Sequence, residues 1–373
     1  MTFTTTAITA KAALLHAVGG PFRIERIEVA LPREDEVLVR MVGVGVCHTD
    51  IVCRDGFPVP LPIVLGHEGA GIVEAVGARV THLRPGDPVV LSFNSCGHCH
   101  SCEKDHPATC AQFIPSNFAG RRLADGSTPL SKDGADVNGM FFGQSSFATY
   151  AIARALNTVK VSGKAPLHLL GPLGCGIQTG AGAVINSLKP TPGDSLAIFG
   201  GGAVGLSALL AARAIDVDKV FVVEPNPERR ALALELGAAA AIDPRDGRVV
   251  EDVLKELSGG GVSFAIDATG IPAVIGQAIN VTLPGGTVGL IGVPPPDGQI
   301  PATLLDLLVK GVTLRPITEG DANPQTFIPY MIDLYLAGRF PFDRLITTFP
   351  FEQINEAMHA AEKGRVIKPV LVF

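Results

Sequence analysis

The pattern of hydrophobic and polar positions changes near residue 194. Over residues 8–90, short apolar or alternating runs are separated by turns rich in Gly, Pro and acidic residues, which predicts a β-rich, barrel-like region. Beyond residue 194, apolar runs of strand length alternate with segments whose apolar residues recur at helical spacing. This alternation predicts a doubly wound parallel sheet of six strands in an α/β protein.

A glycine-rich turn separates the first two strands expected in this sheet. It reads GGGAVG from Gly200 and fits the pattern G-x-G-x-x-G. Gly200 allows a tight turn, Gly202 lets a pyrophosphate approach the backbone, and Gly205 lets the following helix pack against the strand. The helix N-terminus attracts phosphate groups. The motif therefore predicts a dinucleotide site, and the alternative is an ordinary glycine-rich turn.

The second strand of this unit ends on an acid, Glu224. Its carboxylate can accept hydrogen bonds from ribose hydroxyl groups, and it repels a 2′-phosphate. The sequence therefore favours NAD over NADP. The alternative for Glu224 is a surface carboxylate.

Composition narrows the classes of protein that need to be considered. The chain has 373 residues, enough for two domains, with 47% hydrophobic residues and a net charge of −6. Without a basic excess, we expect no nucleic-acid partner and no membrane partner. The uncharged run over residues 195–212 is nearly long enough to span a membrane, but its three consecutive glycines favour a strand and a helix. The N-terminus shows no signal-peptide pattern, so we expect a cytoplasmic protein.

Four of the seven cysteines form a cluster in a polar loop. Cys96, Cys99, Cys102 and Cys110 have the spacing C-x2-C-x2-C-x7-C. Four thiolates at such spacing can surround one tetrahedral zinc ion and leave no open position, which predicts a structural site. An iron–sulfur cluster or uncoordinated cysteines are the alternatives.

Three further segments carry residues of a second kind of zinc site. Cys47, His67 and Cys175 provide two thiols and one imidazole, a known ligand set for catalytic zinc with one open position. Their wide separation carries no spacing signal. Each also has a simpler interpretation, as a buried apolar cysteine or a hydrogen-bonded loop histidine.

Five motifs in order, GVCHTD, GHEGAG, CGHCHSC, GCGIQTG and GGGAVG, closely resemble those of the zinc-dependent medium-chain alcohol dehydrogenases. The segments CRDGFPVPLPIVLGHEG and GQSSFATY resemble in particular the bacterial aryl-alcohol (benzyl alcohol) and geraniol dehydrogenases. The resemblance implies a GroES-like catalytic domain over residues 1–182 with a structural-zinc lobe over residues 94–112. It also implies a Rossmann domain over residues 183–319, and a return to the catalytic domain over residues 320–373.

The resemblance also assigns roles to individual residues. Cys47, His67 and Cys175 would bind catalytic zinc, Thr49 would pass on the proton of the alcohol, and Asp50 would orient His67. Glu68 would lie near the metal. His48 would either contact the cofactor pyrophosphate or serve as a substitute proton relay, because Val52 stands where the family usually has its relay histidine. The implied cofactor-binding residues are Gly200, Gly202, Val204, Gly205, Glu224, Arg229, Thr179, Ile291, Gly292, Val293 and Lys368.

We therefore expect NAD- and zinc-dependent, reversible oxidation of a primary aromatic or allylic alcohol to the aldehyde. Alternatives are a glutathione-linked formaldehyde or general aliphatic alcohol dehydrogenase of the same fold, and a catalytically silent zinc- and nucleotide-binding protein. A homodimer or homotetramer is expected. Candidate substrate-pocket residues are the apolar loop residues Phe57, Val59, Pro60, Leu61, Phe93, Phe118, Phe141 and Phe142.

Overall fold

The computed structural model describes residues 7–373, so the first six residues of the N-terminal stretch considered above lie outside it. The chain divides into two compact units. Unit 1 contains residues 1–175, 323–336 and 343–373, and unit 2 contains residues 176–322 and 337–342. Each unit is described by itself.

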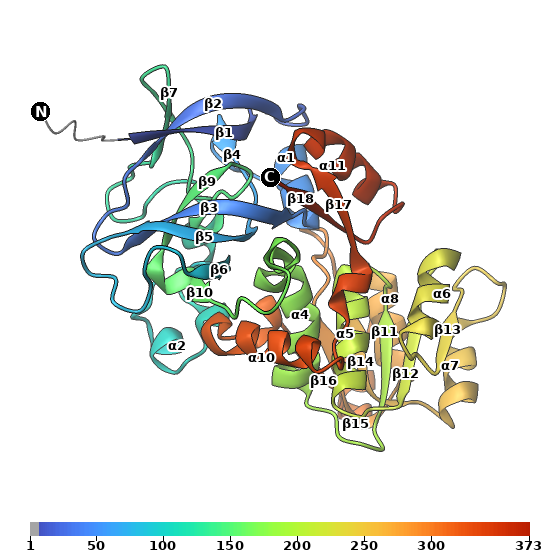
Figure 1. The fold of residues 1–373 in the computed structure, drawn as a ribbon. Coiled ribbons are helices and arrows are strands. Elements are labelled where there is room, and N and C mark those ends of the chain that lie inside the picture. Colours follow the sequence, from blue (N-terminus) through green and yellow to red (C-terminus); the bar gives the residue numbers. More distant parts are fainter. Residues whose placement is uncertain (1–6) are drawn as a thin grey trace, which may run out of the picture. The chain divides into compact units, whose positions relative to one another are not determined.

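Unit 1 is built on two mainly antiparallel sheets (Figure 1). The first has the order β4-β1-β2-β7-β8 (Ile63–Val64, Ala7–Leu15, Arg23–Ala30, Leu130–Lys132, Ala135–Val137). The second has the order β10-β6-β5-β3-β18-β17, with β9 also paired to β3 (Thr158–Lys160, Pro88–Leu91, Glu68–Val76, Glu36–Gly45, Lys368–Val372, Ile346–Pro350, and Tyr150–Arg154 for β9).

Strand β3 explains the position of the site. Its alternating run EVLVRMVGVG buries side chains on both faces and ends at Gly45, two residues before Cys47. It pairs antiparallel with β5, so that Gly45 lies opposite Glu68, and with β18 at the chain's end. The helices of unit 1 are α1, α2, α3, α10 and α11 (His48–Asp55, His100–Glu103, Phe113–Phe118, Pro324–Leu336, Ile354–Glu362).

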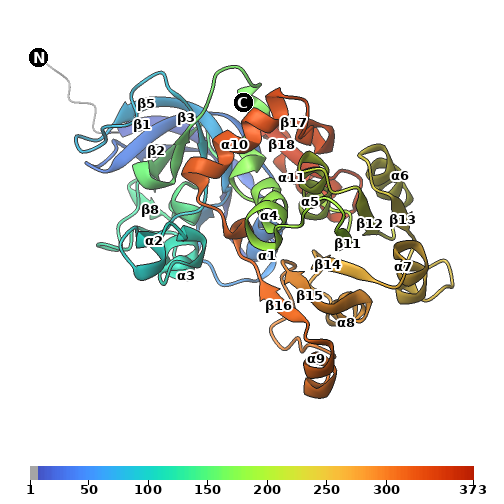
Figure 2. The same ribbon diagram turned by 90° about the horizontal axis from the view of Figure 1, so that it is seen from below.

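Unit 2 contains the six-stranded parallel sheet. Its order is β13-β12-β11-β14-β15-β16 (Ala240–Ile242, Lys219–Val223, Ser195–Phe199, Val262–Asp267, Thr282–Leu290, Thr313–Pro316). Numbered within the unit this is 3-2-1-4-5-6, the order of a dinucleotide-binding sheet. The helices are α4 to α9 (Gly176–Gly182, Ala203–Ala214, Pro227–Glu235, Val250–Ser258, Pro272–Val281, Leu304–Lys310), and Figure 2 shows helices on both faces of the sheet.

Alternation along β11 produces these two covered faces. Ala197 and Phe199 pack in one core cluster with residues of α7 and α8. Ile198 points to the opposite face, where Gly205 of α5 approaches it. The fold class expected from the sequence, a Rossmann sheet inserted into a β-rich domain, is confirmed.

Two glycines of the turn after β11 have different surroundings, which gives a stability test. A Cβ at position 205 would lie 1.8 Å from the Gly200 carbonyl oxygen, whereas a Cβ at position 202 would meet nothing within 4 Å. Gly205→Ala should therefore lower the free energy of unfolding by about 1–3 kcal/mol. Gly202→Ala should change it by less than about 0.5 kcal/mol. Chemical denaturation of both variants checks this, and equal losses would contradict the packing argument.

Candidate active site

Four residues that are distant in sequence bring potential ligand atoms together in unit 1. Cys47 caps the N-terminus of α1, His67 immediately precedes β5, Glu68 begins β5, and Cys175 follows a short 3-10 helix. One ligand atom from each lies within 4.8 Å of the others. The three residues expected at a catalytic zinc therefore converge at one place, together with Glu68.

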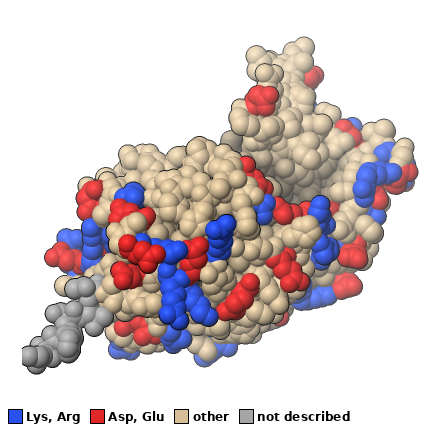
Figure 3. Space-filling model, turned by 90° about the horizontal axis from the view of Figure 1, so that it is seen from above, with Lys and Arg blue, Asp and Glu red and all other residues tan. Residues whose placement is uncertain are grey.

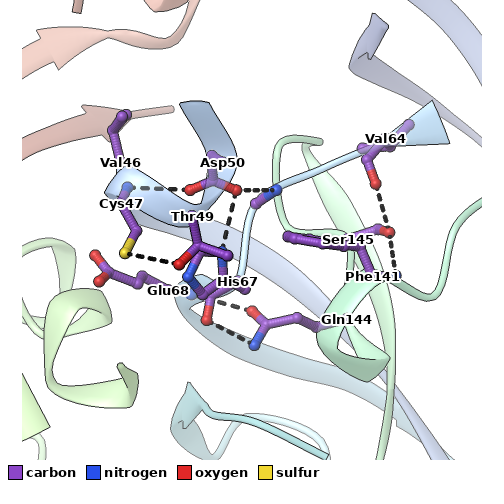
Figure 4. A network of polar contacts seen from close by, with 12 residues as sticks. Val46, Cys47, Thr49, Asp50, Val64, His67, Glu68, Phe141, Gln144 and Ser145 are labelled. Carbon is purple, nitrogen blue, oxygen red and sulfur yellow. Dashed lines mark hydrogen bonds and ion pairs between the residues drawn. The ribbon is translucent and has the colours of Figure 1, made fainter. Parts of the chain in front are cut away.

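Asp50 holds this arrangement in place through three hydrogen bonds (Figure 4). Its Oδ1 accepts from His67 Nδ1 at 3.0 Å and from the Gly66 amide at 3.0 Å. Its Oδ2 accepts from the Cys47 amide at 3.0 Å. Because Asp50 is fully buried, these bonds are shielded from water. They fix both the His67 ring and the turn that carries Cys47.

The donor set fits a zinc ion. With Nδ1 bound to Asp50, His67 Nε2 is buried and has no hydrogen-bond partner among the described residues. An unpaired buried nitrogen is costly, and a metal ion would satisfy it. The hydrogen bond with Cys175 lowers the pKa of Cys47 well below that of an ordinary thiol, and the charge of Lys368 acts in the same direction. Two sulfur atoms and one imidazole nitrogen are typical of catalytic zinc.

Lys368, at the start of β18, lies beside these residues. It is 3% exposed, and its Nζ donates to both carboxylate oxygens of Glu68 at 2.8 and 2.9 Å and to the Val46 carbonyl at 3.2 Å. Burial raises the pKa of Glu68, and the nearby Lys368 charge only partly opposes this. The resemblance assigned Lys368 to the cofactor pyrophosphate, whereas in the structure its ammonium group contacts Glu68 within unit 1.

Thr49 and His48 occupy the first turn of α1. Thr49 Oγ1 lies 3.8 Å from Cys47 Sγ, which puts its hydroxyl group beside the ligand atoms (Figure 4). His48 is solvent-exposed, and Val52 is half-buried one turn further along the helix. The chain therefore has a hydroxyl group at the site and an imidazole next to it in sequence that faces solvent.

Aromatic side chains extend from His67 to the protein surface. Phe142 stacks on the His67 ring with a centroid distance of 4.4 Å, and Phe141 contacts the same ring edge-on at 5.5 Å. Phe118 packs against Phe142 at 5.2 Å, and Phe57 packs against Phe118 at 4.9 Å. Phe57, Phe118, Phe141 and Phe142 are called the aromatic cluster below.

The cysteine lobe forms a second potential metal centre. The Sγ atoms of Cys96, Cys99, Cys102 and Cys110 all lie within 4.8 Å of one another, with several pairs at 3.5–3.9 Å. Zinc–sulfur bonds of about 2.3 Å at tetrahedral angles give separations of about 3.8 Å. Backbone amides of Cys102 and Ala111 lower the pKa of Cys99 to about 6, which favours the thiolate that a metal requires. No disulfide links any of the seven cysteines, all of which are described.

The cofactor-binding residues expected in unit 2 surround the carboxyl ends of its central strands. The turn with Gly200, Gly202, Val204 and Gly205 connects β11 to α5. Glu224 follows β12, is 5% exposed, and accepts hydrogen bonds from the amides of Gly201 (2.6 Å) and Asn226 (2.8 Å). The remaining members lie on α4, on α6 and directly after β15: Thr179, Arg229, and Ile291, Gly292 and Val293.

Two polar residues at the site were not identified from the sequence. The Gln144 amide bonds the backbone at His67, Gly69 and Ser92, and the Ser92 hydroxyl bonds the carbonyl of Gly174. Gln144 lies within the quoted segment GQSSFATY, but nothing in that pattern indicates a contact with residues more than 70 positions away.

The distribution of charged side chains is visible on one face of the molecule. On the face drawn in Figure 3, acidic and basic side chains are intermingled, without an area dominated by Lys and Arg. No helix within residues 7–373 has the length and apolarity needed to cross a bilayer.

Comparison with known proteins places these sites in a class. Residues 33–163 match the model of the alcohol dehydrogenase GroES-like domain, and residues 203–337 match that of the zinc-binding dehydrogenases. The chain belongs to the zinc-dependent medium-chain alcohol dehydrogenases, enzymes that oxidise alcohols.

Particular relatives cover almost the whole chain. It is 64% identical over 366 residues to a geraniol dehydrogenase of Castellaniella defragrans, covering 98% of each chain. It is 50% identical to an alcohol dehydrogenase zinc-binding domain protein from Burkholderia ambifaria (TM-score 0.95; 98% of this chain, 99% of the other). It is 42% identical to the benzyl alcohol dehydrogenase of Acinetobacter calcoaceticus (TM-score 0.94; 98% and 99%).

Metal analysis tests the two centres separately. We expect two zinc ions per purified chain. Cys175→Ala should lose one ion and alcohol oxidation with it while the chain stays folded, because the lobe keeps its four thiolates. Cys99→Ala should lose the other ion and lower the thermal unfolding midpoint, because that ion orders a polar loop. Elemental analysis with thermal denaturation measures both, and a parent chain that retains at most one zinc would contradict the assignment.

Proposed function

We propose that this enzyme catalyses the NAD-dependent, reversible oxidation of primary aromatic or allylic alcohols, of the benzyl alcohol or geraniol type, to aldehydes. The observation that carries the proposal is the buried His67 Nε2, which has no hydrogen-bond partner in the described chain and lies between two thiols and an aromatic cluster. The imidazole nitrogen and the two thiols suit a zinc ion, and the aromatic cluster suits an unsaturated substrate.

Cys47, His67 and Cys175 would hold the catalytic zinc, and the four lobe cysteines would hold a structural zinc. When bound at the first site, zinc lowers the pKa of an alcohol hydroxyl group at its open position. Asp50 keeps the proton of His67 on Nδ1, so Nε2 remains available as a ligand. Thiol ligands persist in a reducing compartment, which agrees with a cytoplasmic enzyme.

Thr49 would accept the alcohol proton, because its hydroxyl group lies beside the ligand atoms. The exposed imidazole of His48, the neighbouring residue, would release that proton to water in place of the relay histidine that Val52 replaces. Glu68 would supply a carboxylate near the metal for use during ligand exchange, and Lys368 holds that carboxylate in an ion pair.

Unit 2 would hold NAD, which would supply the hydride acceptor of the reaction. The amide groups at the start of α5 and the small residues Gly200, Gly202 and Gly205 suit a pyrophosphate. Glu224 suits the adenosine ribose, because its carboxylate is held in place by two backbone amides and repels a 2′-phosphate. Arg229 would lie near this ribose, and Thr179 and the backbone of residues 291–293 would position the nicotinamide. Lys368 was also assigned to the pyrophosphate, and that role competes with its ion pair to Glu68.

The aromatic cluster supports the substrate class. Phe141 is fully buried against His67, whereas Phe57 at the other end is 37% exposed, so a continuous series of ring contacts connects an exposed ring with His67. Aromatic faces and edges pack well against a benzyl ring or an allylic double bond. Two of the relatives above bear the names geraniol dehydrogenase and benzyl alcohol dehydrogenase, which agrees with this choice. A short aliphatic alcohol or a glutathione adduct would use less of this surface.

We further propose that two copies pair through unit 2. Strand β16 is the last strand of its sheet. Helix α9 next to it exposes four apolar residues, at 66–87% of their surface: Leu304, Leu305, Leu308 and Val309. An edge strand beside apolar surface is suited to pairing with another strand, and a second copy offers the same edge in antiparallel orientation.

A substrate panel tests the proposed reaction. We expect kcat/KM to be highest for benzyl alcohol or geraniol, lower for ethanol and S-hydroxymethylglutathione, and at least about tenfold higher with NAD than with NADP. Initial rates of NADH formation measure it. As a control, Gly202→Ala should fold normally but raise the KM for NAD, since its methyl group would occupy space near the pyrophosphate. A preference for ethanol or for the glutathione adduct would refute the proposed substrate class.

Sedimentation velocity tests the proposed assembly. The 38.8 kDa chain should sediment as a dimer or larger oligomer. Leu308→Asp should produce monomers, because a buried unpaired carboxylate is unfavourable at an interface. Leu234→Asp replaces a leucine on α6 that is 51% exposed and should leave the assembly unchanged. A monomeric parent chain, or equal dissociation of both variants, would argue against this interface.

A further inference from the structure

The side chain of Gln144 forms hydrogen bonds at every polar position of its amide. It is 1% exposed. Its Nε2 donates to the His67 carbonyl at 2.9 Å (Figure 4). The same Nε2 donates to the Ser92 carbonyl at 3.0 Å, and Oε1 accepts from the Gly69 amide at 3.2 Å. Gln144 therefore connects the backbone on both sides of Glu68, at His67 and Gly69, with Ser92, which directly follows strand β6.

Ser92 extends this connection to the third expected zinc ligand. Its hydroxyl group donates to the Gly174 carbonyl at 2.6 Å, and Gly174 directly precedes Cys175. We call Gln144 and Ser92 the backbone bracket. Through it, the segment carrying His67 and the segment carrying Cys175 are joined by buried hydrogen bonds.

The loop that carries Gln144 has an unusual backbone. Phe142 and Ser145 have φ values of 51° and 47°, a left-handed conformation that residues other than glycine rarely adopt. Ser145 Oγ donates to the Val64 carbonyl at 2.6 Å, and the Phe141 amide donates to Ser145 Oγ at 2.9 Å. Strained residues persist where surrounding contacts fix them, and they concentrate at functional sites. Here the conformation places the Phe142 ring on the His67 imidazole and the Gln144 amide on the His67 backbone.

We propose that the backbone bracket is a positioning device for the catalytic zinc: it holds His67 and Cys175 at ligand separation before the ion binds, and it slows release of the ion. This inference rests on the proposed zinc site. Neither bracket residue has its side chain among the candidate ligands, so the bracket acts only through the backbone of His67 and Gly174. Groups that orient metal ligands typically change metal affinity by about 10–100-fold when removed.

The chain offers a matched control for Gln144. Asn117 is also fully buried in unit 1, and its amide makes the same three kinds of bond, donating to the carbonyls of Asn94 and Phe113 and accepting from the Asn94 amide. None of these partners bonds the His67 or Gly174 backbone. Gln144→Met and Asn117→Leu therefore remove equivalent hydrogen bonds while largely preserving side-chain volume.

Zinc release to a chromogenic chelator, followed together with loss of benzyl alcohol oxidation, tests the bracket. The zinc whose release parallels the loss of activity should leave Gln144→Met at least about tenfold faster than the parent, and Asn117→Leu at the parent rate. Cobalt-substituted Gln144→Met should also show shifted ligand-field absorption bands, because the ligand geometry changes. Thermal unfolding of both variants shows whether they are equally destabilised.

Equal release rates in the two variants, or release that simply follows loss of stability, would overturn the inference. If Gln144→Met fails to fold, Ser92→Ala removes the bond to the Gly174 carbonyl and should still speed release several-fold; an unchanged rate would likewise overturn the inference. The parent enzyme separates this result from the proposed function. A parent that binds two zinc ions and oxidises the alcohol, but responds to neither bracket variant, contradicts the bracket alone.

Discussion

The hydrogen bond between Asp50 and His67 is the interaction on which the active site depends. A neutral imidazole has one donor and one acceptor nitrogen, and the Asp50 carboxylate fixes the donor at Nδ1. Nε2 is therefore left as a lone-pair donor in a buried place that offers it no other partner among the described residues. The same carboxylate bonds the Cys47 amide, so two ligands take their positions from one buried charge. Without Asp50, the Cys47 backbone and the His67 ring would lose the carboxylate to which both are hydrogen-bonded.

That buried charge belongs to a balanced set. Asp50, Glu68 and the thiol of Cys47, whose pKa is lowered, place negative charge in a region shielded from water, and Lys368 supplies a buried positive charge. Isolated charges are very costly in such a place, whereas paired and hydrogen-bonded ones can be tolerated. A doubly charged cation would offset the excess negative charge. The electrostatics of the described residues thus favour a cation where the ligand atoms converge.

Local patterns in the sequence predicted the strands, the helices and the cysteine lobe. Contacts between residues far apart in the sequence were not predicted. The period change near residue 194, the glycine turn and the cysteine spacing all describe neighbours in sequence, so they predicted the sheet and the lobe. The Glu68–Lys368 pair spans 300 positions and the Gln144–His67 bond spans 77, and no periodicity links such residues. The resemblance likewise gave Lys368 a role on the cofactor, which stays a prediction, but it gave no sign of the contact with Glu68, because a motif identifies a residue type without showing which buried carboxylate it meets.

Strand β18 has a consequence for how the enzyme is made. Lys368 is the sixth residue from the C-terminal end, and its strand pairs with β3, which begins at Glu36. During synthesis, the long stretch that forms unit 2 emerges between these partners and contains all six strands of its own sheet. Unit 2 can therefore fold while translation continues, whereas the ion pair beside the metal ligands can form only after β18, which follows unit 2 in the chain, has been synthesised.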